Sequence, residues 1–223
     1  MNLPYHIGII MDGNRRWAKQ RGLSPLQGHK KGLEVFEEIA KHCQKRGIKI
    51  LTVFAFSTEN WNRSKKEVDY LMNLFLNAFN KKRIDELIKE KVKVNILGQK
   101  HRLSKKLQKK IQEIEESTKV NSKLILNIAL SYGGRADIVE AIKKIGNKKI
   151  TEDLISKNLW TQGLKDPDLI IRTSNEKRIS NFLIWQVAYS ELYFSDKCWP
   201  AFDEKELDKI LKEYDKRKRR FGR

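Results

Sequence analysis

The chain has 223 residues, a length that fits one large domain, and 39% of them are hydrophobic, which is enough to bury a core. Lys and Arg number 47 against 28 Asp and Glu, and the net charge of +19 favours a polyanionic partner such as nucleic acid, an anionic membrane or a phosphorylated metabolite. The sequence shows no signal peptide and no apolar run as long as the ~18 residues of a membrane-spanning helix. Cys43 and Cys198 belong to no metal-binding or redox motif. We therefore expect a reduced, cytoplasmic protein of one domain, residues 1–223, with at most peripheral membrane contact.

The first predicted strand is an apolar run at residues 7–11, which stops at Asp-Gly-Asn. A helical pattern follows, so the stretch is typical of a buried strand, a tight turn and a helix start. Gly13 lets the backbone approach a ligand closely, and a helix N-terminus beside Arg15 and Arg16 suits a phosphate. Asp12 would repel that phosphate unless a cation such as Mg²⁺ lay between them. The alternative interpretation is an N-capping turn with solvated arginines.

Strands and helices alternate along the rest of the chain. Further strands are predicted at residues 48–56, 92–97, 124–130 and 169–172, with a short apolar segment at 191–194. Helices are predicted at residues 30–46, 68–89, 103–117, 136–145, 151–160 and 182–189, with a loop at 22–28 and a charged helix from 203 that ends in a basic run at 216–220. The alternation predicts an α/β fold whose central, mostly parallel sheet is flanked by helices. Ligands bind such sheets at the carboxyl ends of the strands, where three polar clusters would therefore meet.

The predicted helix at residues 68–89 is apolar over more than one stripe. A helix with a single core face needs only about three apolar positions in seven. The helix is therefore either packed between two layers or lines an apolar cavity with one face.

The polar clusters supply a set of candidate site residues. Asp12 and Glu191 are candidate metal ligands, Arg15, Arg16, Arg63, Arg172 and Arg178 are candidate phosphate clamps, Ser57 and Ser180 are hydroxyl donors, and His29 follows a glycine. P-loop, dinucleotide-binding and Ser/His/Asp patterns are absent from the sequence. A site rich in Arg and poor in nucleophiles suits a reaction with a phosphate leaving group and an apolar second partner. Each of these residues also has a structural interpretation when it is considered alone. His29 could be a helix-start residue, and Trp17 and Trp61 could pack in the core or at its rim. Glu191 and the basic tail could be solvated charges.

Ordered motifs cover nearly the whole chain. They are His6-x-x-x-Ile10-Met11-Asp12-Gly13-Asn14-x-Arg16-Trp17-Ala18, Gly28-His29-x-x-Gly32, Phe56-Ser57-Thr58-Glu59-Asn60-Trp61-x-Arg63, Asn127-x-Ala129-x-x-Tyr132-Gly133-Gly134-Arg135, Ile171-Arg172-Thr173-Ser174, Glu176-x-Arg178-Ile179-Ser180-Asn181-Phe182, Trp185-Gln186, Ala188-Tyr189-x-Glu191 and Trp199-Pro200-x-Phe202. In these motifs and their order the sequence resembles the cis-prenyltransferases, and within them the bacterial enzymes that make undecaprenyl diphosphate.

The resemblance implies an activity and its residues. The family condenses an allylic diphosphate, typically farnesyl diphosphate, with successive isopentenyl diphosphates through new cis double bonds. It implies that Asp12 holds Mg²⁺ and assists departure of the diphosphate, and that Glu191 completes the metal site. It places Gly13, Asn14, Arg16 and His29 around the allylic diphosphate and Arg172, Arg178 and Ser180 around the isopentenyl diphosphate. Arg15, Trp17, Ser57, Thr58, Glu59, Trp61, Arg63 and Ile179 complete the expected substrate-binding set.

The position usually assigned to proton removal is Asn60. A neutral amide is a very weak base, so Asn60 could instead position a water or a diphosphate oxygen that takes the proton. The resemblance also implies a long-chain product that serves as the lipid carrier precursor for cell-wall synthesis, a homodimer, and peripheral membrane contact for product release. A growing prenyl chain needs a dry tunnel, which we expect the helix at 68–89 and the apolar strand faces to enclose.

Two positions depart from the family pattern. Pro25 stands where the family commonly has an arginine, so one phosphate contact is lost or supplied elsewhere. Asn175 stands where a turn usually has glycine, and Asn tolerates a left-handed backbone well enough to keep the turn. The rival functions are RNA binding, which would leave Asp12 and Glu191 without a role, and a short-chain or heteromeric prenyltransferase. We therefore expect isoprenoid diphosphates as partners rather than nucleic acid.

Overall fold

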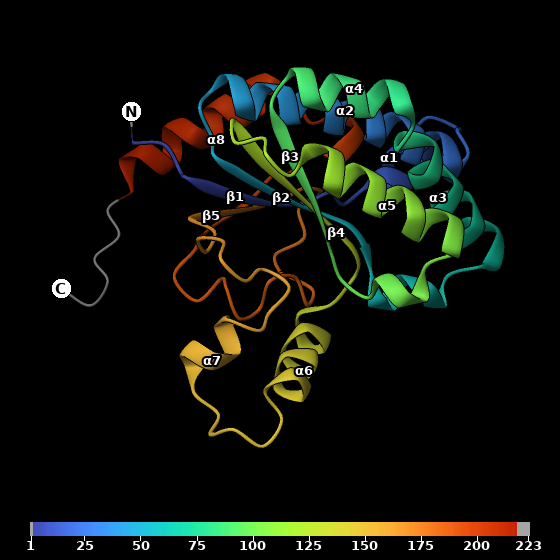
Figure 1. Cartoon of the computed structure of the whole chain (residues 1–223). Coiled ribbons are helices and arrows are strands. Elements are labelled where there is room, and N and C mark those ends of the chain that lie inside the picture. The colour runs from blue at the N-terminus through green and yellow to red at the C-terminus, as the bar shows by residue number, and fades with distance from the viewer. Residues whose placement is uncertain (1, 218–223) are drawn as a thin grey trace.

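The sheet at the centre of the molecule has six strands in the order β3-β4-β2-β1-β5-β6. The structure is a computed structural model that describes residues 2–217 (Figure 1). The strands are β1 His6–Ile10, β2 Ile50–Ser57, β3 Val92–Leu97, β4 Leu124–Tyr132, β5 Leu169–Arg172 and β6 Glu191–Phe194. Every neighbouring pair is parallel, which confirms the predicted α/β fold with a parallel sheet.

Helices cover both faces of the sheet. They are α1 Asn14–Lys19, α2 Pro25–Lys45, α3 Lys65–Ala78, α4 Lys81–Lys89, α5 Lys105–Thr118, α6 Gly134–Ile145, α7 Glu152–Ser156 and α8 Glu204–Lys216. Figure 1 shows α6 and α7 on one side of the sheet and the other helices on the opposite side. All residues of β1 and β5 are buried, because a parallel sheet with both faces covered needs continuous apolar strands rather than alternating ones.

The long helix predicted at residues 68–89 is in fact two helices. Phe79 ends α3 with φ −91° and ψ 45°, and the Asn80 side chain caps α4 by accepting a hydrogen bond from the Arg83 N–H. An Asn at the N-cap competes with helix continuation because its side chain satisfies an otherwise unpaired backbone donor. The predicted continuous helix was therefore wrong at this junction, although both halves are helical.

Helix α2 begins at Pro25, inside the loop predicted at residues 22–28. Ser24 and Gln27 form a reciprocal capping box. Pro25 occupies the first helical position, where the backbone N–H that proline lacks would have no partner within the helix. His29 consequently lies within the helix rather than before it.

The C-terminal third departs furthest from the prediction. Residues 182–189 form turns instead of a helix, and positive φ values at Asn181 and Leu183 interrupt the helical path. Helix α7 ends at Ser156, short of the predicted 160, and the apolar segment at 191–194 is a sixth strand. Lys216 ends α8, and residues 218–220 of the basic run lie outside the described residues.

A row of hydrogen bonds crosses four strands near the amino ends of β1 and β2. Asn95 donates to Asn127, which donates to the Thr52 hydroxyl, over 2.8 and 2.9 Å. The Thr52 hydroxyl donates to His6 Nε2 at 2.7 Å, and His6 Nδ1 donates to the Lys165 carbonyl at 2.6 Å. These assigned roles require a neutral imidazole, and burial lowers the pKa of His6 to about 4.

Within residues 2–217, none of the helices combines the length and the apolar character needed to cross a bilayer.

Candidate functional site

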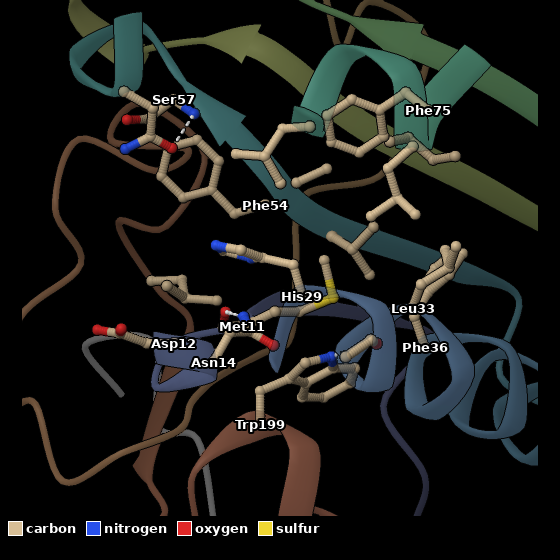
Figure 2. A pocket seen from close by; sticks show the side chains of 18 of the residues that line it. Met11, Asp12, Asn14, His29, Leu33, Phe36, Phe54, Ser57, Phe75 and Trp199 are labelled. Carbon is tan, nitrogen blue, oxygen red and sulfur yellow. Dashed lines mark hydrogen bonds between the residues drawn. The ribbon is translucent and has the colours of Figure 1, made fainter. Parts of the chain in front are cut away.

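The polar clusters meet at the carboxyl ends of β1, β2 and β5, as the parallel sheet predicted. Asp12 follows β1, Ser57 ends β2, and Arg172 ends β5 beside Ile10 of β1. A cavity of about 620 Å³ begins among these residues and extends between α2, α3 and the sheet (Figure 2). Its mouth is polar and its interior is apolar.

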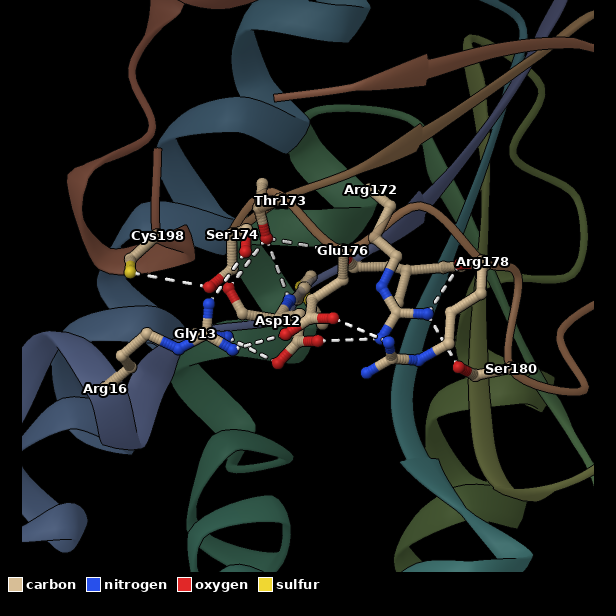
Figure 3. Close-up of polar contacts among 12 residues, drawn as sticks. Asp12, Gly13, Arg16, Arg172, Thr173, Ser174, Glu176, Arg178, Ser180 and Cys198 are labelled. Atoms are coloured by element: carbon tan, nitrogen blue, oxygen red, sulfur yellow. Dashed lines mark hydrogen bonds and ion pairs between the residues drawn. The ribbon is translucent and has the colours of Figure 1, made fainter. Parts of the chain in front are cut away.

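The Asp12 carboxylate lies between the α1 turn and a buried arginine (Figure 3). Its Oδ1 accepts a hydrogen bond from the Gly13 N–H at 2.7 Å, and its Oδ2 accepts one from Arg172 Nη2 at 2.8 Å. Arg172 also donates to the Arg178 carbonyl at 2.5 Å and to the Ser180 hydroxyl at 2.6 Å. The arginine side chain is 5% exposed and the aspartate 34%, so the guanidinium is fixed from behind while the carboxylate faces the mouth.

Backbone geometry explains why this turn needs glycine. Gly13 has φ +97°, a conformation that disfavours side chains, and a Cβ there would lie 2.7 Å from the Ser174 Oγ and 2.9 Å from Cys198. Thr173 stabilises the same turn, because its hydroxyl accepts from the Asp12 N–H at 2.8 Å and donates to the Asp12 carbonyl at 2.7 Å. The turn is therefore held in one shape from both sides.

The Gly28-x-x-x-Gly32 spacing positions α2 against this turn. A Cβ on Gly32 would lie 2.1 Å from the Asn14 Oδ1, so α2 can approach Asn14 only without a side chain at that position. Asn14 itself donates to the Met11 carbonyl at 3.1 Å. The close approach places His29, on the same helix, at the cavity wall.

A second carboxylate, Glu67, gathers two arginines and a histidine at the mouth. Arg63 Nη1 lies 3.0 Å from it, His29 Nε2 3.3 Å and Arg15 Nη1 3.8 Å. Burial, together with the neighbouring Arg63 and Arg15 charges, lowers the pKa of His29 and outweighs the opposing effect of Glu67, so His29 is mainly neutral at pH 7. Glu67 was not among the predicted site residues.

Glu67 did have a sequence signal. It stands three residues after Ser64 and four after Arg63, which is the spacing of a helix-capping glutamate and of an i,i+4 ion pair. The Ser64 side chain does cap α3 by accepting from the Glu67 N–H.

Glu176 forms a third cluster of opposite charges. It lies 2.6 Å from both Arg16 Nη2 and Arg178 Nη1, and the hydrogen bond from Arg16 is the main reason that its pKa is lowered. Arg16 also donates to the Ser174 carbonyl at 2.8 Å. Asn175 has φ +56°, which confirms that Asn keeps the left-handed turn where glycine was expected.

The cavity interior is lined by apolar side chains from helices and strands, most of them from α2, α3 and β2. Its lining includes Leu33 and Phe36 of α2, Leu71, Leu74, Phe75 and Ala78 of α3, Phe79 at the end of α3, Val53 and Phe54 of β2, and Ile128 of β4. The face predicted from Leu71, Phe75 and Phe79 is thus the face that lines the cavity. Of the two interpretations of the 68–89 helix, the cavity-lining one is confirmed for α3.

The structure gathers most, but not all, of the predicted site residues. Those that line the cavity are Asp12, Asn14, His29, Ser57, Glu59, Asn60, Arg63, Arg172 and Ser180. Gly13, Arg15, Arg16 and Arg178 contact the carboxylates around the mouth, while Trp17, Thr58 and Ile179 lie outside the lining. Asn60 accepts a hydrogen bond from the Ser57 N–H at 3.1 Å, which orients its side chain.

Trp61 and Glu191 lie away from the mouth. Trp61 packs edge-on against Phe56 with 5.1 Å between ring centroids and donates to the Ser131 hydroxyl. Glu191 begins β6 opposite Leu169, at the amino end of the strands, and pairs with Arg217 at 2.8 Å. Within one chain the sheet therefore separates Glu191 from Asp12, which follows the carboxyl end of β1.

Comparison with known proteins places the sequence in one family. The sequence model of the prenyltransferase family described as putative undecaprenyl diphosphate synthase matches residues 10–222. The chain belongs to this cis-prenyltransferase family. It is 51% identical to an isoprenyl transferase of Fusobacterium nucleatum, over 99% of this chain and 96% of that protein, and 50% identical to one of Aquifex aeolicus, over 100% and 97%.

Solved structures of this prenyltransferase family have the same fold as this chain. Lavandulyl diphosphate synthase from Lavandula x intermedia, in complex with dimethylallyl diphosphate, superposes with a TM-score of 0.94 at 37% identity, covering 99% of each chain. A probable undecaprenyl diphosphate synthase from Campylobacter jejuni gives 0.85 at 35% identity and covers 100% of both chains. This prenyltransferase thus shares its fold with relatives whose names indicate different products.

Proposed function

We propose that this prenyltransferase extends farnesyl diphosphate with successive isopentenyl diphosphates into a long-chain cis-polyprenyl diphosphate, undecaprenyl diphosphate, for use as a cell-wall lipid carrier. The observation that carries the proposal is the apolar cavity of about 620 Å³ behind a mouth rich in arginine. A dry cavity stabilises a prenyl tail, because each buried CH₂ contributes ~0.8 kcal/mol. The cationic mouth stabilises diphosphate, for which fixed guanidinium groups are well suited.

Two groups of residues are proposed to hold the two substrates. Gly13, Asn14, Arg16 and His29 would bind the allylic diphosphate at the start of α1, where the backbone N–H groups of the first helical turn suit an anion. Arg172, Arg178 and Ser180 would bind the isopentenyl diphosphate, and Arg172 already contacts the other two. This arrangement brings the two reacting carbons together at the mouth, with the allylic tail directed into the cavity.

The proposed reaction breaks the allylic carbon–oxygen bond, with its electron pair leaving on the diphosphate. The double bond of isopentenyl diphosphate attacks the allylic carbon, and a proton leaves the adjacent carbon to form the new cis double bond. A diphosphate oxygen is a far stronger base than a neutral amide, because the pKa of its conjugate acid lies much closer to the working pH. Asn60 would therefore orient the acceptor, consistent with its own fixed orientation by Ser57.

The Asp12 carboxylate fits a magnesium site. Mg²⁺ uses one or two carboxylates together with substrate phosphates and waters, and Asp12 presents a partly exposed carboxylate at the mouth. Such an ion supplies positive charge that neutralises the leaving diphosphate. Glu191 lies at the other end of the strands within the chain, so its proposed share in the metal site stays a prediction.

A homodimer and peripheral membrane contact belong to the same proposal. Among the described residues β6 is an edge strand, and its Leu192 is 39% exposed, which supports a two-fold contact through this edge. The net charge of +19 supports contact with an anionic bilayer during product release.

The proposed function is tested with the purified protein, Mg²⁺, farnesyl diphosphate and labelled isopentenyl diphosphate. We expect a ladder of intermediates that ends in products of many isoprene units, and no incorporation when Mg²⁺ is chelated. Parallel reactions primed with dimethylallyl diphosphate show which primer is preferred. A product of a single condensation with every primer would refute long-chain synthesis.

A further inference from the structure

Asn181 lies where the segment after Ser180 meets the turn between β4 and α6. Helix α6 begins after Gly133, which has no side chain to cap it. Asn181 supplies the cap from a distant part of the chain, because its backbone carbonyl accepts the Gly134 N–H at 2.7 Å and its Oδ1 accepts the Arg135 N–H at 2.9 Å. The first N–H groups of a helix have no partner within it, so Asn181 pairs two of them.

The two glycines of this turn leave room for Asn181. A Cβ on Gly133 would lie 2.5 Å from the Thr58 Oγ1 and 2.8 Å from the Asn181 Nδ2. A Cβ on Gly134 would lie 2.6 Å from the Ile184 Cγ1 and 3.1 Å from the Asn181 carbonyl oxygen. Carbon atoms pack at about 3.5–4.0 Å, so a side chain at either position would push these neighbours away. The Gly-Gly motif therefore lets the turn close around Asn181.

The amide nitrogen of Asn181 contacts the segment that follows β2. Its Nδ2 donates to Glu59 Oε1 at 2.9 Å, and Glu59 belongs to the short helix η1, Thr58–Asn62. Partial burial raises the pKa of Glu59, but the hydrogen bonds that it accepts from its own N–H, from Asn181 and from neighbouring hydroxyls lower this pKa by more. Glu59 is therefore an anion at pH 7, and a hydrogen bond to an anion is stronger than one to a neutral acceptor.

The requirements of the backbone and of the side chain together specify asparagine at position 181. Asn181 has φ +66°, in the left-handed region that Asn and Gly tolerate better than most residues. Glycine would suit this backbone but has no side chain. Aspartate would accept the Arg135 N–H but has no donor for Glu59. Asparagine meets all three requirements.

Both neighbours of Asn181 are fixed in or beside the candidate site. The Ser180 hydroxyl accepts from Arg172 at 2.6 Å, and the fully buried Phe182 stacks on Phe54 of β2 with 4.8 Å between ring centroids. Ser180 has φ +45°, and such a backbone persists where surrounding contacts determine it. The three hydrogen bonds of Asn181 supply contacts of this kind directly beside Ser180.

We propose that Asn181 is a positioning residue for isopentenyl diphosphate, which joins η1 and α6 to residues 178–180 and so holds these residues at a fixed place against the allylic site. This inference rests on the proposed function, which assigns isopentenyl diphosphate to Arg178 and Ser180. The Asn181 side chain donates to one protein group and accepts from another, so it acts through the segment that carries it rather than on the substrate.

The role is tested by exchanging the donor and the acceptor between positions 181 and 59. Asn181→Asp keeps the side-chain shape and the acceptor for Arg135, but it places a second carboxylate against Glu59. We expect the KM for isopentenyl diphosphate to rise at least about tenfold, the effect of one lost hydrogen bond to a charged group, and the KM for farnesyl diphosphate to stay within about twofold. Asn181→Asp combined with Glu59→Gln restores the hydrogen bond in the reverse direction. This double variant should return the KM for isopentenyl diphosphate to within about threefold of the wild type.

Two further variants complete the experiment. Glu59→Ala breaks the same hydrogen bond and leaves the cap of α6 intact, so it should raise the same KM even where Asn181→Asp is too unstable to measure. The matched control is Asn158→Asp, which removes an amide donor to the Leu154 carbonyl after α7 and should change neither KM. Urea unfolding of each variant reports its stability separately from its kinetics.

An unchanged KM for isopentenyl diphosphate in Asn181→Asp would overturn the positioning role and leave the proposed function standing. Equal increases in both KM values, without rescue by the double variant, would also overturn it, because a general loss of structure affects both substrates. A wild-type enzyme that stops after one condensation would overturn long-chain synthesis, while the KM values of that first condensation still decide the role of Asn181.

Discussion

Asp12→Asn separates the role of the Asp12 charge from its role in the turn. The substituted amide keeps the shape of the side chain, and its oxygen can still accept the Gly13 N–H that Asp12 Oδ1 accepts at 2.7 Å. The lost group is the negative charge that lies 2.8 Å from Arg172 Nη2. The variant therefore tests whether that charge is needed for catalysis rather than for folding.

The stability cost of this substitution is limited by the surroundings of Arg172. Breaking a fully buried ion pair costs about 3–5 kcal/mol, and losing an exposed one costs about 1 kcal/mol or less. Asp12 is 34% exposed, and Arg172 retains acceptors on Arg178 and Ser180. We expect a loss of about 1–3 kcal/mol in the free energy of unfolding, which leaves the protein folded at 25 °C.

The rate should fall much further than the stability. Removing one electrostatic contact to a charge that develops in the transition state costs about 10²–10³ in turnover, and the same carboxylate is the proposed metal ligand. Turnover is measured with labelled isopentenyl diphosphate, and unfolding with urea. Asp153→Asn, at an exposed ion pair of α7, is the control and should match the wild type in both measurements. A rate above about a tenth of the wild type, on the order of 1.4 kcal/mol in barrier, would remove Asp12 from the mechanism.

Three further predictions follow from the same structure. Ala78→Leu adds bulk to the lining of the cavity, so it should shorten the product without raising the KM for isopentenyl diphosphate, and an unchanged product distribution in a folded, active variant would contradict this. Analytical ultracentrifugation at micromolar concentration should give a dimer mass, and a fully active monomer would refute the dimer. The pKa of His6 is lowered from 6.5 to about 4, so protonation opposes folding: stability should be complete above pH 6.5 and fall by up to about 3 kcal/mol as the pH drops toward 4. Urea unfolding across that range checks this, and a dependence equally steep in His6→Gln would show that other groups cause it.

The strands and the turn after β1 could be predicted from local sequence. The apolar run of β1 has no polar alternation because both faces of the sheet are covered, and an Asp-Gly-Asn turn directly after such a run has few other interpretations. The parallel order then brings Asp12, Ser57 and Arg172 to one edge without further information.

The elements that the sequence predicted wrongly are those where the apolar spacing indicates one structure and another interaction favours a different one. The apolar spacing alone predicts that α3 continues through Asn80. The helix ends there instead, because the Asn80 side chain accepts a hydrogen bond from the Arg83 N–H and caps α4. In residues 182–189 the apolar spacing is helical, but Leu183 is fully buried with φ +47°, so tertiary packing overrides the pattern.

The carboxylate partners of Arg15 and Arg16 could not be predicted from sequence spacing. Glu67 and Glu176 each pair with arginines that are far away in sequence, Arg15 and Arg16 respectively. The sequence predicted these arginines as phosphate clamps without partners, whereas in the structure carboxylates hold them in place.

The most direct test of the account is a crystal structure of the protein with Mg²⁺ and an unreactive analogue of farnesyl diphosphate. We expect the diphosphate within hydrogen-bond distance of the backbone N–H groups at the start of α1 and of His29, the metal ion bound to Asp12, and the prenyl tail in the cavity beside Phe75 with its end toward Phe79. A tail that lies outside this cavity, or a diphosphate bound away from Asp12, would contradict the central claim that this mouth and cavity form the site of chain elongation.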